Sequence, residues 1–122
     1  AIKNEKLHKI THDHTLVNLL VSTGELTPEQ AKFHPRKNLL TRALGANDPI
    51  EIDIFDVDNN VQGLFLCSDG LTNMVTEEQI EKVLNNKSSI EEQVEKLIKK
   101  SNMRGGTDNI SIAYLKKESG DL

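Results

Sequence analysis

The chain is organised around Leu64-Phe65-Leu66-Cys67-Ser68-Asp69-Gly70-Leu71-Thr72, an apolar stretch that ends in an aspartate followed by glycine. A short apolar run of this kind is typical of a buried strand, and the glycine permits a sharp turn and the close approach of a ligand. A second segment, Arg104-Gly105-Gly106-Thr107-Asp108-Asn109-Ile110-Ser111-Ile112, places glycines before its aspartate and an apolar strand after it. We therefore predict that Asp69 and Asp108 are held rigidly where strands meet turns.

Rigid carboxylates are suited to hard metal ions. Mg²⁺ and Mn²⁺ take oxygen ligands in near-octahedral geometry and keep several waters, so a few carboxylates suffice. Taken alone, Asp-Gly and Asp-Asn are common turn dipeptides that indicate nothing more than a turn. The two aspartates are distant in sequence, but adjacent strand ends would bring them together, and the pair favours a metal site.

Length and composition restrict the class of protein. The 122 residues fit one domain, and 36% hydrophobic and 28% charged residues are ordinary for a soluble globular protein. No apolar run approaches the ~20 residues that cross a bilayer, so we expect no membrane partner. The net charge of -4 argues against nucleic acid, which needs a basic face. Because Cys67 has no cysteine to pair with and no signal peptide is visible, we expect a cytoplasmic location.

Helix signals occur in both halves of the chain. Apolar residues between Thr15 and Ser22 stop at Gly24, a common helix terminator. Thr27-Pro28-Glu29-Gln30 has a capping residue, a proline in the first turn and a glutamine three places on, and His34-Pro35 ends that helix.

Two further helices are predicted near the C-terminus. Thr76-Glu77-Glu78-Gln79 forms a capping box ahead of apolar residues at helical spacing. The stretch from Ser89 to Glu92 repeats this device, and Lys99-Lys100 lies at the favourable C-terminal end of the helix that follows.

Strand signals complete a mixed α and β pattern. The isoleucines of Ile50-Glu51-Ile52-Asp53-Ile54 alternate with acidic residues, as in a half-buried strand. Gly63 to Cys67 reads as a compact buried strand, Ile110 to Leu115 as a final strand, and Ile2 to Thr11 as an edge strand or hairpin. The segment from Asn38 to Gly45 fits either a short helix or a strand. Hairpin-like spacing suggests antiparallel pairing.

The two aspartate segments resemble the C-terminal motifs of the PP2C-type (PPM family) metal-dependent serine/threonine protein phosphatases. Two further segments resemble, in the same order, those around that family's flap: Thr11-His12-Asp13-His14-Thr15-Leu16-Val17 and the stretch from His34 to Gly45. The likeness runs from about Lys6 to Leu115 and is greatest to the compact bacterial members.

This resemblance implies a fold, an activity and a set of ligands. The implied fold is α+β, an antiparallel β-sandwich flanked by helices, of which residues 1–122 would be the C-terminal portion with a flap-like segment at about 15–44. Asp69 and Asp108 would bind Mg²⁺ or Mn²⁺ in a centre of two or more metals, and Asn109 would support the loop. The implied reaction is hydrolysis of phosphoserine and phosphothreonine by metal-activated water. Its partners would be phosphorylated proteins, with a cognate serine/threonine kinase acting on the same targets.

The chain also departs from the family's pattern. Members carry, in their N-terminal half, an acidic Asp-Gly metal motif, a phosphate-binding arginine and a Gly-Asp-Ser-like motif, and none of these is present here. The chain alone is therefore expected to be inactive, with its catalytic and substrate-binding residues in the missing half. An alternative is a catalytically inactive phosphatase-like fragment that acts as a binding or regulatory module. Half a sandwich would expose strand edges and apolar faces, which predicts self-association.

Other chemistry fits the sequence less well. His12 and His14 suggest zinc, but a structural zinc site needs four nitrogen or sulfur ligands at tight spacing, so packing or surface roles are favoured. The run from Asp56 to Asn60 starts like an EF-hand loop, but Val61 replaces the required glycine. Cys67 fits a small core residue better than a nucleophile. Arg42 fits a structural hydrogen-bonding role better than a phosphate contact.

Overall fold

The structure, a computed structural model, describes residues 1–46, 49–106 and 108–118. The chain divides into two compact units. The first, here called the sheet unit, joins Ala1–Lys9 to Val57–Leu122, and the second, the small unit, is Ile10–Asp56. The segment predicted to resemble a flap, at about 15–44, lies within the small unit, and its role as a flap stays a prediction.

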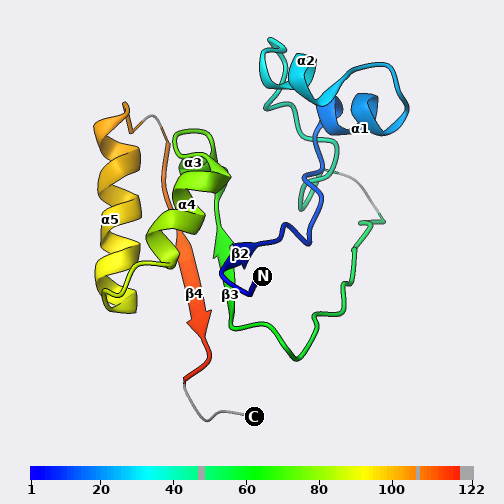
Figure 1. Cartoon of the computed structure of the whole chain (residues 1–122). Coiled ribbons are helices and arrows are strands. Elements are labelled where there is room, and N and C mark those ends of the chain that lie inside the picture. Colours follow the sequence, from blue (N-terminus) through cyan, green and yellow to red (C-terminus); the bar gives the residue numbers. More distant parts are fainter. Residues whose placement is uncertain (47–48, 107, 119–122) are drawn as a thin grey trace. The chain divides into compact units, whose positions relative to one another are not determined.

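The sheet unit holds an antiparallel sheet of four strands in the order β2-β1-β3-β4 (Figure 1). The strands are β1 (Ile2–Lys3), β2 (Lys6–Leu7), β3 (Gly63–Cys67) and β4 (Ile112–Lys116). The predicted N-terminal hairpin is confirmed, with Asn4 and Glu5 forming its turn at φ 52° and 63°. The α+β class is confirmed as well, and the described residues form this one sheet of the expected sandwich.

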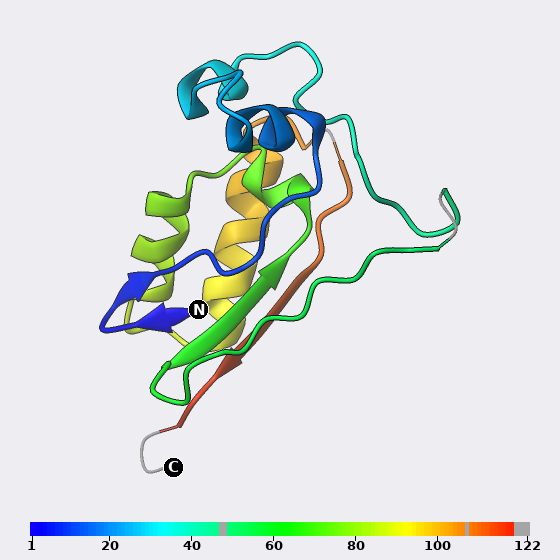
Figure 2. The same cartoon turned by 90° about the vertical axis from the view of Figure 1, so that its right-hand side faces the viewer.

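Helices α4 (Glu77–Leu84) and α5 (Ile90–Met103) lie on the same side of this sheet (Figures 1 and 2). The capping box predicted at Thr76 is confirmed, because its side chain and that of Gln79 bond to each other's backbone. At Ser89 the hydroxyl accepts from the backbone N–H of Glu92, so the Ser89 half of the capping box predicted there is confirmed. A single turn, α3 (Asp69–Thr72), links β3 to α4.

The core lies between the sheet and the helices. Alternation along the strands points Phe65 and Tyr114 into it, and their rings meet edge to face at 5.8 Å. The predicted core role of Cys67 agrees with its packing against this cluster. The buried residues of the cluster are Ile2, Leu71, Val75, Ile80, Val83, Leu84 and Leu97.

The opposite face of β3 and β4 is apolar and open. Leu66 pairs with Ala113 and Leu64 with Leu115, and Leu66 and Leu115 are 61% and 68% exposed. An exposed apolar sheet face of this kind favours association. The self-association expected from the sequence stays a prediction.

The small unit contains α1 (Leu16–Ser22), predicted from its apolar run and Gly24, and α2 (Pro28–Lys32), predicted from its cap. The capping box at Thr27 is complete, and Gly24 adopts the left-handed φ of 82° after α1. The sequence left residues 38–45 open between a short helix and a strand. The structure shows neither there, apart from one isolated β-bridge between Thr15 and Leu40.

The strand predicted at residues 50–54 is wrong. The segment has no regular secondary structure, and Ile52 and Ile54 are 75% and 90% exposed. A strand requires a neighbour to pair its N–H and C=O groups, and no strand among the described residues pairs with this segment. The acidic residues of this segment, Glu51 and Asp53, form ion pairs with Arg42.

Candidate metal centre

Asp69 stands at the point where β3 gives way to α3. It is the first residue of α3 and follows the N-cap, Ser68, by one position. The Ser68 hydroxyl forms no cap bond with α3. It instead accepts from the backbone N–H of Ser111 at 3.0 Å and donates to the carbonyl of Asn109 at 3.3 Å. With the Ser68 N–H donating to the Ser111 carbonyl at 2.9 Å, the two aspartate segments are joined side by side.

Gly70 makes this junction possible. It is buried, and a Cβ at this position would overlap the carbonyl oxygen of Asn109 and lie 2.9 Å from the carbonyl carbon. The sequence suggested that this glycine admits a ligand. The close neighbour in the structure is the backbone of Asn109, and the approach of a ligand stays a prediction. Gly70 thus holds together the residues next to Asp69 and Asp108.

Asp108 follows the loop that leaves α5. Gly105 and Gly106 have φ values of 126° and 50°, conformations that favour glycine. Asp108 Oδ1 accepts from the backbone N–H of Asn109 at 2.7 Å, which orients the carboxylate. Thr107, quoted in the motif, lies outside the described residues. The predicted strand after Asp108 is confirmed, although β4 begins at Ile112 because the preceding residues bond to Ser68.

The arrangement suits a hard cation but supplies few ligands. Asp69 and Asp108 are exposed carboxylates on segments fixed by direct backbone contact, and their oxygens are the donors that Mg²⁺ and Mn²⁺ prefer. No group of three or more His, Cys, Asp or Glu residues that could hold a metal ion occurs within residues 1–46, 49–106 and 108–118. The residues present therefore fit part of a metal centre.

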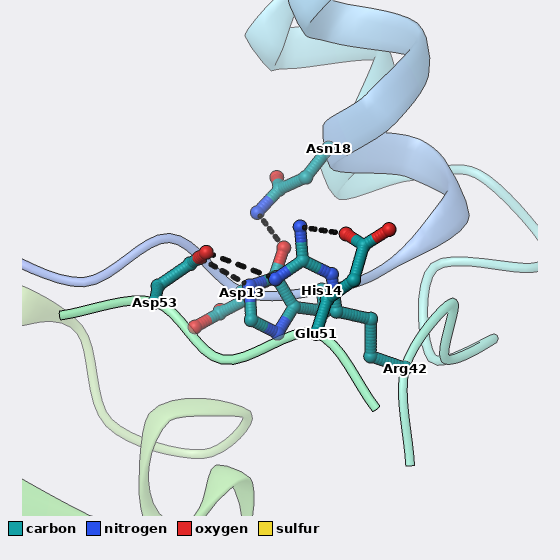
Figure 3. A network of polar contacts seen from close by, with 6 residues as sticks. All are labelled: Asp13, His14, Asn18, Arg42, Glu51 and Asp53. Carbon is teal, nitrogen blue, oxygen red and sulfur yellow. Dashed lines mark hydrogen bonds and ion pairs between the residues drawn. The ribbon is translucent and has the colours of Figure 1, made fainter. Parts of the chain in front are cut away.

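A second polar cluster lies within the small unit, around Asp53 (Figure 3). His14 Nε2 lies 2.8 Å from Asp53 Oδ2, and Arg42 Nη1 donates to Asp53 Oδ1 at 3.0 Å. Arg42 also lies 3.1 Å from Glu51 Oε2. The hydrogen bond from His14, followed by that from Arg42, lowers the pKa of Asp53 below its ordinary value. These bonds agree with the structural role predicted for Arg42.

The histidines considered for zinc contact other groups. The His12 ring meets Phe55 edge to face at 6.1 Å, while His14 binds Asp53. Beside them, Asn18 donates from its side chain to the Asp13 carbonyl at 2.9 Å and ties α1 to the preceding loop (Figure 3). Residues 12–14 therefore act in packing and hydrogen bonding within the small unit.

Comparison with known proteins finds bacterial phosphatases that are similar to this chain. The chain is 44% identical over 117 residues to the serine/threonine phosphatase Stp of Listeria welshimeri, covering 95% of the chain and 46% of that protein. It is 38% identical over 121 residues to the protein phosphatase PhpP of Streptococcus pneumoniae, covering 98% of the chain and 49% of PhpP. A relative in Streptococcus pyogenes, 41% identical, is a putative PP2C-type phosphatase. The chain is homologous to PP2C-type serine/threonine phosphatases.

Solved structures of PP2C-type phosphatases share the fold. The serine/threonine phosphatase of S. agalactiae superposes with a TM-score of 0.88 at 38% identity, over 95% of the chain and 48% of that structure. Stp1 of Staphylococcus aureus gives 0.88 at 32% identity, over 97% and 47%. The catalytic domain of PstP, in complex with two manganese ions, gives 0.73 at 30% identity, over 94% and 47%.

These matches cover only part of the length of the related proteins. The chain spans about half the length of the curated PP2C-type relatives it matches and corresponds to their C-terminal half. No protein-family model matches it. In the part of the chain that the structure describes, no helix is long and apolar enough to span a membrane.

Proposed function

We propose that this chain supplies the C-terminal half of a Mg²⁺- or Mn²⁺-dependent protein phosphatase that hydrolyses phosphoserine and phosphothreonine. Asp69 and Asp108 are the metal ligands it contributes, and Asn109 supports them through its backbone. The observation that carries the proposal is the packing of Gly70 on Asn109, which brings together the residues adjacent to the two carboxylates. A PP2C-type relative that contains two manganese ions supports the choice of metal.

The residues of this chain have a restricted part in the reaction. Bound Mg²⁺ or Mn²⁺ supplies water activation and neutralises charge on the phosphoryl group. Asp69 and Asp108 hold oxygen donors in place, and the Asn109 N–H keeps Asp108 Oδ1 oriented. The remaining ligands, the general acid and the phosphate-binding arginine would come from an N-terminal half. The chain alone would bind metal weakly and be inactive.

The proposal extends to the substrates, the location and the flap of the intact enzyme. Its substrates would be phosphorylated proteins in the cytoplasm, shared with a serine/threonine kinase. The small unit, which contains residues 15–44, would act as a flap that influences substrate choice.

A fusion protein tests the proposal. The N-terminal half of the Listeria welshimeri phosphatase, joined to this chain, should hydrolyse a phosphothreonine peptide in the presence of Mn²⁺. Asp69→Asn or Asp108→Asn should reduce kcat/KM by more than the ~10–100-fold that changes beside metal ligands cause.

The matched control for this test is Asp56→Asn, which removes an exposed carboxylate from residues 50–56. It should leave hydrolysis and its Mn²⁺ dependence unchanged. Full activity in both Asp69→Asn and Asp108→Asn would show that the ligand assignment is wrong. An active fusion with no requirement for divalent metal would remove the proposed metal dependence. A folded fusion with no activity in Mn²⁺ would favour the binding-module alternative.

A further inference from the structure

One residue of α5 bonds to both aspartate segments. The Ser101 side chain is fully buried, and its Oγ donates to the carbonyl of Gly70 at 3.0 Å. The Ser101 carbonyl accepts the N–H of Gly106 at 3.3 Å. Gly70 directly follows Asp69, and Gly106 lies two residues before Asp108. Ser101 therefore contacts both segments. Its side chain bonds next to Asp69, and its backbone carbonyl bonds close to Asp108.

The direction of the Ser101 hydroxyl is informative. A serine inside a helix commonly bonds back to a carbonyl of its own helix, whereas this hydroxyl reaches a different element, α3. A helix as short as α3, with four residues, is not stable by itself and depends on contacts to its neighbours. The bond from Ser101 is such a contact, and it fixes the turn that begins with Asp69.

The loop before Asp108 depends on the same end of α5. Gly106 has a left-handed φ of 50°, and a Cβ there would lie 3.1 Å from Asn102 Oδ1, so the loop is packed against the helix. The helix end is itself held, because Arg104 Nη1 donates to the Met74 carbonyl at 2.9 Å and to Gln79 Oε1 at 2.7 Å. A displacement of this helix end would therefore move both carboxylate segments.

We infer that Ser101 is a positioning residue for the metal centre, which sets the Asp69 turn and the Asp108 loop in one mutual geometry. The inference rests on the proposed function, because it takes Asp69 and Asp108 as the ligands. Loss of the Ser101 hydroxyl would keep both carboxylates in the chain but would leave their positions relative to each other less well fixed. Metal affinity should then fall while the fold is retained.

The test is a Mn²⁺ titration of the 122-residue chain, followed by paramagnetic broadening of its backbone amide NMR signals. In the wild-type chain the signals of residues 69–71 and 108–110 should broaden together at one Mn²⁺ concentration. Ser101→Ala should require several-fold more Mn²⁺, up to roughly tenfold for the loss of one buried hydrogen bond. Ser101→Thr keeps a hydroxyl and should recover much of this loss.

The matched control is Gln93→Met, an isosteric change at another fully buried polar residue of α5. Gln93 Nε2 donates to the carbonyls of Asn86 and Ser88, remote in sequence from either aspartate segment. The variant should lower stability and leave the Mn²⁺ midpoint unchanged.

The outcomes separate the two claims. If Ser101→Ala keeps the wild-type midpoint while Asp69→Asn abolishes broadening, the inference about Ser101 is wrong and the ligand assignment stands. An equal midpoint shift in Gln93→Met would reduce Ser101 to a contributor to stability. Broadening that is unaffected by Asp69→Asn, or absent from the wild-type chain, would contradict the proposed function itself.

Discussion

At the scale of single residues, the carboxylates of this chain have contrasting surroundings. Asp69 and Asp108 are exposed, the first shortly after β3 and the second in the loop before β4. Asp53 is engaged by His14 and Arg42 within the small unit. The sequence singled out the first two as candidate ligands through their apolar and glycine neighbours, and that role stays a prediction. It missed the third, because the pairing of Arg42 with residues 51 and 53 depends on a loop with no local pattern.

The Asp53 cluster predicts a pH dependence of the small unit. Because hydrogen bonds from His14 and Arg42 lower the folded-state pKa of Asp53, its stabilising effect is complete above the ordinary aspartate pKa of about 3.9. The effect is lost as the pH falls through the lowered pKa of the folded chain. An NMR titration of the Asp53 carboxyl should give a midpoint that rises towards the ordinary value in His14→Gln and in Arg42→Gln.

His8→Gln is the control for this titration, since His8 lies in the sheet unit and forms no bond to Asp53 in the described structure. The Asp53 midpoint should be unchanged in that variant. An identical midpoint in the wild type and in both His14→Gln and Arg42→Gln would show that the cluster does not form in solution.

At the scale of elements, what the sequence could predict depended on whether the signal was local. The caps at Thr27 and Thr76 lie within three residues of their partners, so both helices were predicted with their starts. The strand predicted at Ile50–Ile54 failed because pairing is a non-local property, and Ile52 has no ladder partner among the described residues. The requirement for glycine at position 70 is also non-local, because a side chain there would overlap the backbone of Asn109.

Gly70→Ala tests the packing of α3 against the segment before β4. The added methyl group would overlap the Asn109 carbonyl, so the backbone must move, at a cost of about 1–3 kcal/mol in the free energy of unfolding. Urea unfolding should show a lower midpoint with an unchanged slope. Thr72→Ala, at an exposed position of the same short helix, should stay within about 0.5 kcal/mol of the wild type. Equal midpoints for Gly70→Ala and the wild type would contradict this contact.

At the scale of the whole molecule, the sheet unit has the character of half a layered fold. One face of β3 and β4 packs on helices, and the other exposes Leu66 and Leu115. This exposed face agrees with a chain that spans about half the length of its PP2C-type relatives. The sequence predicted a partial match through the family motifs that it lacks, whereas the exposed face required the structure.

The most direct test of the metal centre is a crystal structure of the phosphatase fusion grown with Mn²⁺, with the metal located by anomalous scattering. We predict a Mn²⁺ ion coordinated by both Asp69 and Asp108, with oxygen–metal distances of roughly 2.1 Å, as for Mg²⁺. A structure in which Mn²⁺ occupies the enzyme but contacts neither carboxylate would contradict the account.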